Sequence, residues 1–176
     1  MIELYVPEKA DLWFRKELLS DSDTMSYNRG YDLGFPEYHN ETGCIDFPEE
    51  NWDGWYQRWV NAQPERFYAY LRRKSDGAFL GEVNLYQKGP EGWYEMGIVL
   101  HAKYRGQGYS KEGIKLLLRY AFENMGAAAV SNEFETSRKA AWKIHEAAGF
   151  QPVCKADNLV TLVVTKEQYE SLTSKI

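Results

Sequence analysis

The chain has 176 residues, which suits one domain with a full hydrophobic core. Hydrophobic residues make up 44% of it, yet no apolar run approaches the roughly 20 residues of a membrane span, so we expect no membrane partner. The formal net charge of -5 argues against nucleic acid as a partner, because a phosphate backbone requires a basic surface. A negative charge is consistent either with a cationic substrate such as an amine or simply with solubility.

The first 65 residues predict a strand, two helical stretches and a long loop. Residues 2–6 form the strand, and a helix follows Pro7, which suits a first helical turn. A helix-capping turn is expected at 20–23. Residues 27–51 are rich in glycine, proline, asparagine and aromatic residues and predict a loop or a broken helix pair; a long ordered loop in a compact domain is often functional. A tryptophan-rich helical stretch follows at 50–61.

The pattern then changes to alternating apolar and polar residues. It predicts three strands, at residues 66–71, 79–86 and 93–100. Tight turns at 75–77 and 89–92 join them, so these strands should form an antiparallel meander.

Residues 114–125 predict an amphipathic helix, because their apolar side chains recur at i, i+3, i+4, i+7, i+8 and i+11. Gly126 ends it as a C-cap. The remaining predicted elements are a strand at 127–134, a helix from 136 or 137 to 149, strands at 150–154 and 159–164, and a polar helix at 165–176. The order β-α-α-β-β-β-α-β-α-β-β, followed by the polar helix, indicates an α/β fold of the α+β kind.

The two cysteines, Cys44 and Cys154, are far apart in the sequence and belong to no metal-binding spacing, and the three histidines are scattered. We therefore expect free thiols and no metal site. The first residues contain no basic segment followed by an apolar one, so we expect a cytoplasmic protein.

The most informative stretch is residues 103–110, between the third meander strand and the amphipathic helix. Such a turn presents unpaired N–H groups and the positive end of the helix dipole, which suits phosphate. Gly106 and Gly108 permit a close backbone approach. The dinucleotide-binding fingerprint requires a third glycine where Lys111 stands, and the Walker pattern is missing. Two interpretations of the loop are left, a short pyrophosphate-binding loop or a plain turn.

Residues 103–108 resemble the acyl-CoA loop of the GNAT superfamily of N-acetyltransferases, Gln/Arg-x-x-Gly-x-Gly/Ala, with Lys103 in the first position. Residues 95–100 resemble the strand before that loop, and 147–150 the end of the last conserved helix. The resemblance covers residues 66–155 and is greatest to the branch that contains the ribosomal-protein N-terminal acetyltransferases.

The resemblance implies a single domain with a mixed, mostly antiparallel and partly splayed sheet of about seven strands flanked by helices. Residues 1–65 would supply the acceptor side, 66–155 the acetyl-CoA-binding core and 156–176 a terminal strand and helix. The implied activity moves acetyl from acetyl-CoA to a primary amine, either a small molecule or a peptide N-terminus, by direct attack in a ternary complex. No metal is needed, and the enzyme would be a monomer or a homodimer.

The resemblance also implies contacts for acetyl-CoA. The pantetheine arm would bind backbone groups of Ile98, Val99 and Leu100. The pyrophosphate would bind at the loop, with nearby positive charge, through Lys103, Arg105, Gly106, Gln107, Gly108, Tyr109 and Ser110.

Two positions of the last conserved helix depart from the family pattern. His145 stands where the family has a tyrosine that often protonates the leaving thiolate, so His145 is either the acid or a packed side chain. Arg138 stands where an asparagine is usual, and either contacts a CoA phosphate or is solvated.

An amine acceptor must also lose a proton, which requires a base. The candidates are Glu82, Glu95 and Glu133, all in predicted strands, and Glu95 matches an acidic position at the head of the family's central strand. Desolvation in a cleft would raise their pKa values, whereas an exposed strand face carries glutamate for solubility.

Aromatic residues in the segment 27–59 are either a wall of the acceptor pocket or core. The candidates for the wall are Tyr31, Phe35, Tyr38, Trp52 and Trp55. Departures from the family pattern leave one alternative function open, a non-catalytic acyl-CoA-binding or regulatory module.

Overall fold

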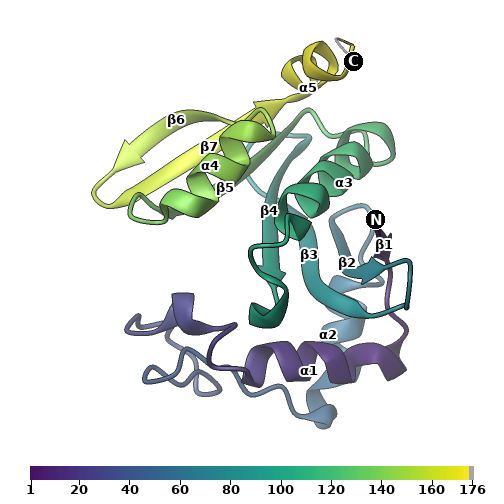
Figure 1. Ribbon diagram of the computed structural model, residues 1–176, viewed down its shortest axis with the longest axis vertical. Helices are drawn as coiled ribbons and strands as arrows, with labels where there is room; N and C mark the ends of the chain where they lie inside the picture. Colours follow the sequence, from purple (N-terminus) through teal and green to yellow (C-terminus); the bar gives the residue numbers. More distant parts are fainter. Residues whose placement is uncertain (175–176) are drawn as a thin grey trace.

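The computed structural model describes residues 1–174 and contains one seven-stranded sheet in the order β1-β2-β3-β4-β5-β7-β6 (Figure 1). Only the β4–β5 pair is parallel. The strands are β1 (Ile2–Tyr5), β2 (Arg66–Arg73), β3 (Phe79–Gln87), β4 (Trp93–Leu100), β5 (Ala129–Glu135), β6 (Gln151–Ala156) and β7 (Leu159–Thr165). The predicted fold class, a mixed and mostly antiparallel sheet in a single domain, is confirmed.

Five α-helices flank this sheet, and none of those in the described chain is long and apolar enough to cross a membrane. They are α1 (Leu12–Ser20), α2 (Trp52–Trp59), α3 (Tyr109–Glu123), α4 (Lys139–Ala147) and α5 (Lys166–Thr173). The last predicted helix is therefore α5, and its predicted end at residues 175 and 176 lies outside the described residues. The region from 27 to 48 is the expected loop, with one isolated bridge between Tyr38 and Ile45.

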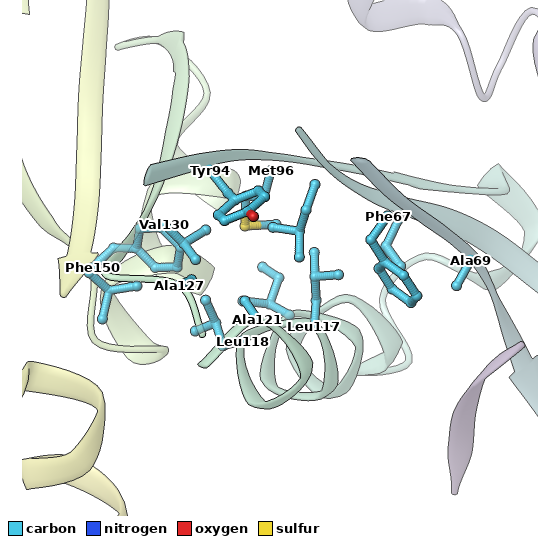
Figure 2. Close-up of a cluster of buried hydrophobic side chains, with 14 of the residues drawn as sticks. Phe67, Ala69, Tyr94, Met96, Leu117, Leu118, Ala121, Ala127, Val130 and Phe150 are labelled. Carbon is cyan, nitrogen blue, oxygen red and sulfur yellow. The ribbon is translucent and has the colours of Figure 1, made fainter. Parts of the chain in front are cut away.

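Two hydrophobic cores lie on opposite faces of the sheet, and β2 contributes to both. Phe67 and Leu71 join the core beneath α3, whereas Tyr68 and Tyr70 join the core beneath α1 and α2. Side chains of a strand alternate between faces, so a strand buried on both faces reads as a continuous apolar run. Figure 2 shows the first core, where Leu117 of α3 and its neighbours pack against strand side chains.

A gap opens between β4 and β5. Their ladder comprises three pairs and ends at Glu95 and Ser131; beyond these residues β4 pairs with β3 and β5 pairs with β7. Figure 1 shows β5, β6 and β7 running at an angle to β3 and β4. The strand edges that face the gap carry backbone donors and acceptors without a strand partner, and these can hydrogen-bond an extended ligand.

Candidate active site

Two cavities meet at this gap, one on each side of the sheet. The first, of about 330 Å³, lies between the gap, α4 and the glycine loop; the second, of about 320 Å³, faces α1 and the long loop. We call them the loop-side and acceptor-side cavities. Six residues line both: Tyr27, Ile98, Val99, Arg138, Ala141 and His145. A ligand in one cavity can therefore reach a ligand in the other.

The glycine loop leaves the first turn of α3 open. Gly106 and Gly108 have φ values of +75° and +85°, which L side chains rarely adopt, and no atom lies within 4 Å of a Cβ built on either. No side chain within residues 1–174 caps the turn that begins at Tyr109. Free N–H groups and the helix dipole thus point into open space, and this arrangement fits a pyrophosphate.

The charged side chains of the loop hold it in place. Arg105 donates to the carbonyls of Asp23 and Thr24, at 3.1 and 2.7 Å. Lys103 Nζ lies 3.5 Å from the Glu17 carboxylate, and Gln107 Nε2 donates to the Lys103 carbonyl at 3.2 Å. The guanidinium is thus an anchor for the loop, and it also lines the loop-side cavity.

The glycine loop is anchored to the turn that follows α1, where the sequence predicted a helix-capping turn at 20–23. The Asp21 carboxylate accepts from the backbone N–H of Thr24 at 2.9 Å and from its hydroxyl, and these bonds lower the pKa of Asp21. The buried Thr24 hydroxyl oxygen accepts from Ala102 N–H at 2.9 Å. The turn after α1 therefore fixes the loop before α3.

Of the residues predicted to bind acetyl-CoA, seven line the loop-side cavity: Ile98, Val99, Leu100, Arg105, Gly106, Ser110 and Arg138. Lys103, Gln107, Gly108 and Tyr109 lie in the loop and the first turn of α3 but do not line it. The Tyr109 ring instead packs edge-on against Tyr104, 6.5 Å between centroids.

His145 is 3% exposed, and both its ring nitrogens are occupied. Nδ1 lies 2.8 Å from the Ala141 carbonyl, which can only accept, so Nδ1 carries the proton. Nε2 then accepts from the amide of Asn132 at 2.8 Å. Burial lowers the pKa of His145, so the ring is neutral at pH 7 and has no free proton to donate.

Arg138 lies at the start of α4, with its guanidinium 5.1 Å from the ring centroid of Tyr27 and 5.9 Å from that of Phe134. Tyr27, 36% exposed, belongs to the long loop, and burial raises the pKa of its hydroxyl. Nearby, the Glu135 carboxylate raises the pKa of the Tyr31 hydroxyl. Residues of the long loop therefore lie beside residues at the far side of the gap.

Glu82, 4% exposed, lines the acceptor-side cavity and accepts from Arg15 Nη1 and from the Tyr68 hydroxyl. Arg15 lies over Trp55, with its Cζ 4.4 Å from the ring centroid. Burial disfavours the charged guanidinium, but the Glu82 carboxylate outweighs this and raises the pKa of Arg15. The arrangement fixes an anion paired with a cation beside the gap.

The other two candidate bases, Glu133 and Glu95, differ in which groups hold their carboxylates and in whether they line a cavity. Glu133 is exposed, lines the acceptor-side cavity and accepts from the Thr161 hydroxyl at 3.0 Å. Glu95 accepts from Tyr86 and Lys88, each at 2.5 Å, and lines neither cavity. Glu133 is therefore the exposed carboxylate that faces the acceptor side.

The five aromatic residues predicted to form the pocket wall lie elsewhere within residues 1–174, and none lines either cavity. Trp55 is buried in the core under α1 and α2, and Trp52 packs against that core. Tyr31, Phe35 and Tyr38 lie on the long loop, where Phe35 and Tyr38 pack together with 6.0 Å between ring centroids.

Four cavity residues with polar or charged side chains were missed by sequence reasoning: Arg15, Tyr27, Asn84 and Asn132. Arg15 and Tyr27 belong to the region where the family pattern is weakest. Asn84 stands between apolar residues in one predicted strand, and Asn132 stands in a polar run, Ser131 to Glu133, in another; polar strand residues of both kinds read as solvent-facing. Only the gap in the sheet brings them to a site.

Comparison with known proteins gives a family match. The profile described as "Acetyltransferase (GNAT) domain" matches residues 1–151. The SPbeta prophage-derived uncharacterized N-acetyltransferase YokL of Bacillus subtilis is 25% identical over 118 residues, 64% of this chain and 63% of that protein. FsC-acetyl coenzyme A-N(2)-transacetylase of Aspergillus fumigatus is 39% identical over 59 residues, 34% of this chain and 25% of that protein. The chain thus spans less than two thirds of the length of these curated relatives.

Solved structures share the fold at low identity. Spermidine N-acetyltransferase from Vibrio cholerae, in complex with CoA and spermine, superposes with a TM-score of 0.76 at 14% identity, covering 96% of this chain and 98% of that one. An acetyltransferase of the GNAT family from Bacillus anthracis gives 0.70 at 18% identity, covering 95% and 99%.

Proposed function

Because this chain belongs to the GNAT acetyltransferase domain family, we propose that it transfers the acetyl group of acetyl-CoA to a primary amine. The observation that carries the proposal is the gap between β4 and β5, with a cavity on each side and six residues common to both. Two substrates that enter from opposite sides meet there directly.

In this proposal the loop-side cavity holds acetyl-CoA. Backbone groups of Ile98, Val99 and Leu100 bind the pantetheine arm along the open edge of β4. The N–H groups at the start of α3 bind the pyrophosphate. Acetyl-CoA supplies the activated thioester, and the chain's part is to orient it with its carbonyl at the gap.

The acceptor amine enters from the other side, where residues of the first 65 positions line the cavity together with β3, β4, β5 and α4. Glu82 lines this cavity, but its carboxylate is already held by Arg15 and Tyr68, so in this scheme it is not the group that takes the amine proton. The ammonium group loses one proton to solvent to become a neutral amine, and Glu133 accepts the second proton as the amide forms, directly or through a water. A C–N bond then forms as the C–S bond breaks, and the CoA sulfur leaves as a thiolate that takes a proton from solvent.

His145 has a positioning role in this scheme. As a neutral ring it holds Asn132 of β5 and Ala141 of α4 together across the floor of both cavities. It thereby fixes α4 against β5 beside the gap, and in this scheme it does not protonate the thiolate.

The acceptor is a primary amine. The Vibrio cholerae structure that shares the fold contains spermine, which favours a small amine. The resemblance to the ribosomal-protein branch favours a peptide N-terminus. Glu82 and Glu133 suit a cationic amine of either kind.

The test is thermal unfolding with and without acetyl-CoA, followed by release of free thiol across a panel of amines. Acetyl-CoA at 100 times its dissociation constant is expected to add about 2.7 kcal/mol of stability. For a chain of this length that raises the melting temperature by about 5–10 °C. Amine-dependent thiol release then supports the transferase.

Two other outcomes contradict the proposal. A melting shift without thiol release on any amine would favour the non-catalytic acyl-CoA-binding module. The absence of any shift at millimolar acetyl-CoA would mean that the glycine loop is only a turn.

A further inference from the structure

Asn84 of β3 lies directly opposite Gly97 of β4 in the antiparallel ladder. Gly97 is two residues beyond Glu95, where the β4–β5 ladder ends. Both residues line the acceptor-side cavity. The pair therefore marks the edge of the gap on the side where the amine enters.

The Asn84 carboxamide occupies the space that a side chain at position 97 would fill. A Cβ built on Gly97 would lie 2.7 Å from Asn84 Nδ2 and 3.0 Å from Oδ1. Gly97 does not have the positive φ that demands glycine, so its role is to leave room. A glycine inside a strand marks the close approach of another group, and here that group is the carboxamide.

Asn84 is partly exposed, and its carboxamide makes no hydrogen bond to another protein group within residues 1–174. Its neighbours along β3, Glu82 and Tyr86, are both held by other side chains. Asn84 is therefore a polar group at the edge of the gap with its hydrogen-bonding capacity unused.

We propose that Asn84 is a substrate-contacting residue that orients the acceptor amine, and that Gly97 serves to admit its carboxamide. The inference rests on the proposed transferase function. The side-chain oxygen accepts one N–H of the amine while Glu133 takes the proton that the reaction removes. The lone pair of the amine nitrogen is then directed into the gap, toward the thioester carbonyl.

The test compares Asn84→Ala, Gly97→Ala and the double variant in the thiol-release assay. Loss of an orienting hydrogen bond is expected to lower kcat/KM for the amine about ten- to a hundredfold, with KM for acetyl-CoA unchanged. Gly97→Ala should give a similar loss, because its methyl group displaces the flexible end of Asn84. The double variant should be no worse than either single variant, since both changes remove one contact.

Two further variants complete the design. Gly54→Ala is the matched control, because nothing lies within 4 Å of a Cβ at that helical glycine, and it should behave as the unaltered chain does. Asn84→Asp keeps the shape and an accepting oxygen and should be more active than Asn84→Ala. Melting temperatures within a few degrees of the unaltered chain establish that each variant is folded.

Several results would overturn the inference. If Asn84→Ala or Gly97→Ala has the same kcat/KM for the amine as the unaltered chain, Asn84 does not contact the amine. If the losses of kcat/KM add in the double variant, the two substitutions act through separate causes. If Asn84→Asp is no more active than Asn84→Ala, the side-chain oxygen does not contact the amine. If the unaltered chain itself releases no thiol with any amine, the transferase function fails and the inference fails with it, a different result from active enzyme with unaffected variants.

Discussion

His145 illustrates how its surroundings decide what a side chain can do. A histidine on an accessible helix face titrates near pH 6.5 and can act as an acid. Here burial lowers the pKa of the ring and holds it neutral, and the hydrogen bonds to Ala141 and Asn132 fix its tautomer. The sequence predicted its place near the site, but both its role as an acid and its role as a packed side chain were compatible with the pattern.

The lowered pKa of His145 predicts a pH dependence of stability. Above about pH 6.5 the ring is neutral in both the folded and the unfolded chain. As the pH falls below 6.5, His145 becomes protonated in the unfolded chain but stays neutral in the folded chain. The free energy of unfolding therefore decreases until the pH reaches the lowered pKa of His145 in the folded chain. Between pH 7.5 and 5.5, His145 accounts for a decrease in the free energy of unfolding of at most about 1.4 kcal/mol.

Urea unfolding at pH 7.5, 6.5 and 5.5 measures this loss. His145→Gln is expected to be less stable overall but to lose less on acidification than the unaltered chain, since the other titrating groups are common to both. Equal losses in the two proteins would mean that the ring is free to take up a proton.

Glu133 and Glu95 provide a second residue-level prediction. Glu133→Gln is expected to lower kcat at least tenfold at saturating amine with KM for acetyl-CoA unchanged, because general-base assistance contributes about 10²–10⁴-fold. Glu95→Gln is the matched comparison, since it makes the same change in a carboxylate held by Tyr86 and Lys88. A large loss in Glu95→Gln with little effect in Glu133→Gln would reverse the assignment.

At the scale of elements, the glycine loop is held by the turn that follows α1. Arg105 bonds to Asp23 and Thr24, and the Thr24 hydroxyl oxygen accepts from Ala102. Glycine spacing predicted the loop and its position before a helix. It did not predict the anchor, because the contacts join residues about 80 apart in the chain.

Arg105→Gln tests the anchor. Its side chain is exposed, so the loss of its two hydrogen bonds is expected to reduce the free energy of unfolding by only about 1 kcal/mol. KM for acetyl-CoA should rise severalfold because the loop is less fixed. Lys103→Gln, which removes an exposed charge at 3.5 Å from Glu17, should change stability by less than about 0.5 kcal/mol.

Urea unfolding and initial rates measure both quantities for each variant. A rise in the Arg105→Gln KM with no change in stability would mean that the guanidinium binds the cofactor directly instead of anchoring the loop.

The strands and helices themselves followed from the sequence to within a few residues. The apolar run of β2, the alternation in β3, the tight turns and the i, i+3, i+4 spacing in α3 are local signals, and they specified the meander and the amphipathic helix. The gap between β4 and β5 left no such signal, because residues on both sides of it read as ordinary strand. Its expectation came from the family resemblance, and the three-pair ladder gives it a physical basis.

At the scale of the whole molecule, the gap joins two cavities on opposite faces of a single sheet. Sequence reasoning left the aromatic residues of the segment 27–59 as either a pocket wall or core, and the structure places Trp52 and Trp55 in or against the second core. Aromatic content alone does not distinguish these places, since both are apolar. The second core supplies Leu19 and Met25 to the acceptor-side cavity, and the pair of Arg15 and Glu82 lines the same cavity.

The measurement that tests this account most directly is the initial rate of thiol release with acetyl-CoA and the amine varied together. Substrates that enter from opposite sides and meet at the gap react in a ternary complex, so reciprocal plots are expected to intersect. Parallel lines, the kinetic signature of a covalent acetyl-enzyme, would contradict direct transfer, and thiol release that does not depend on the amine would contradict the transferase itself.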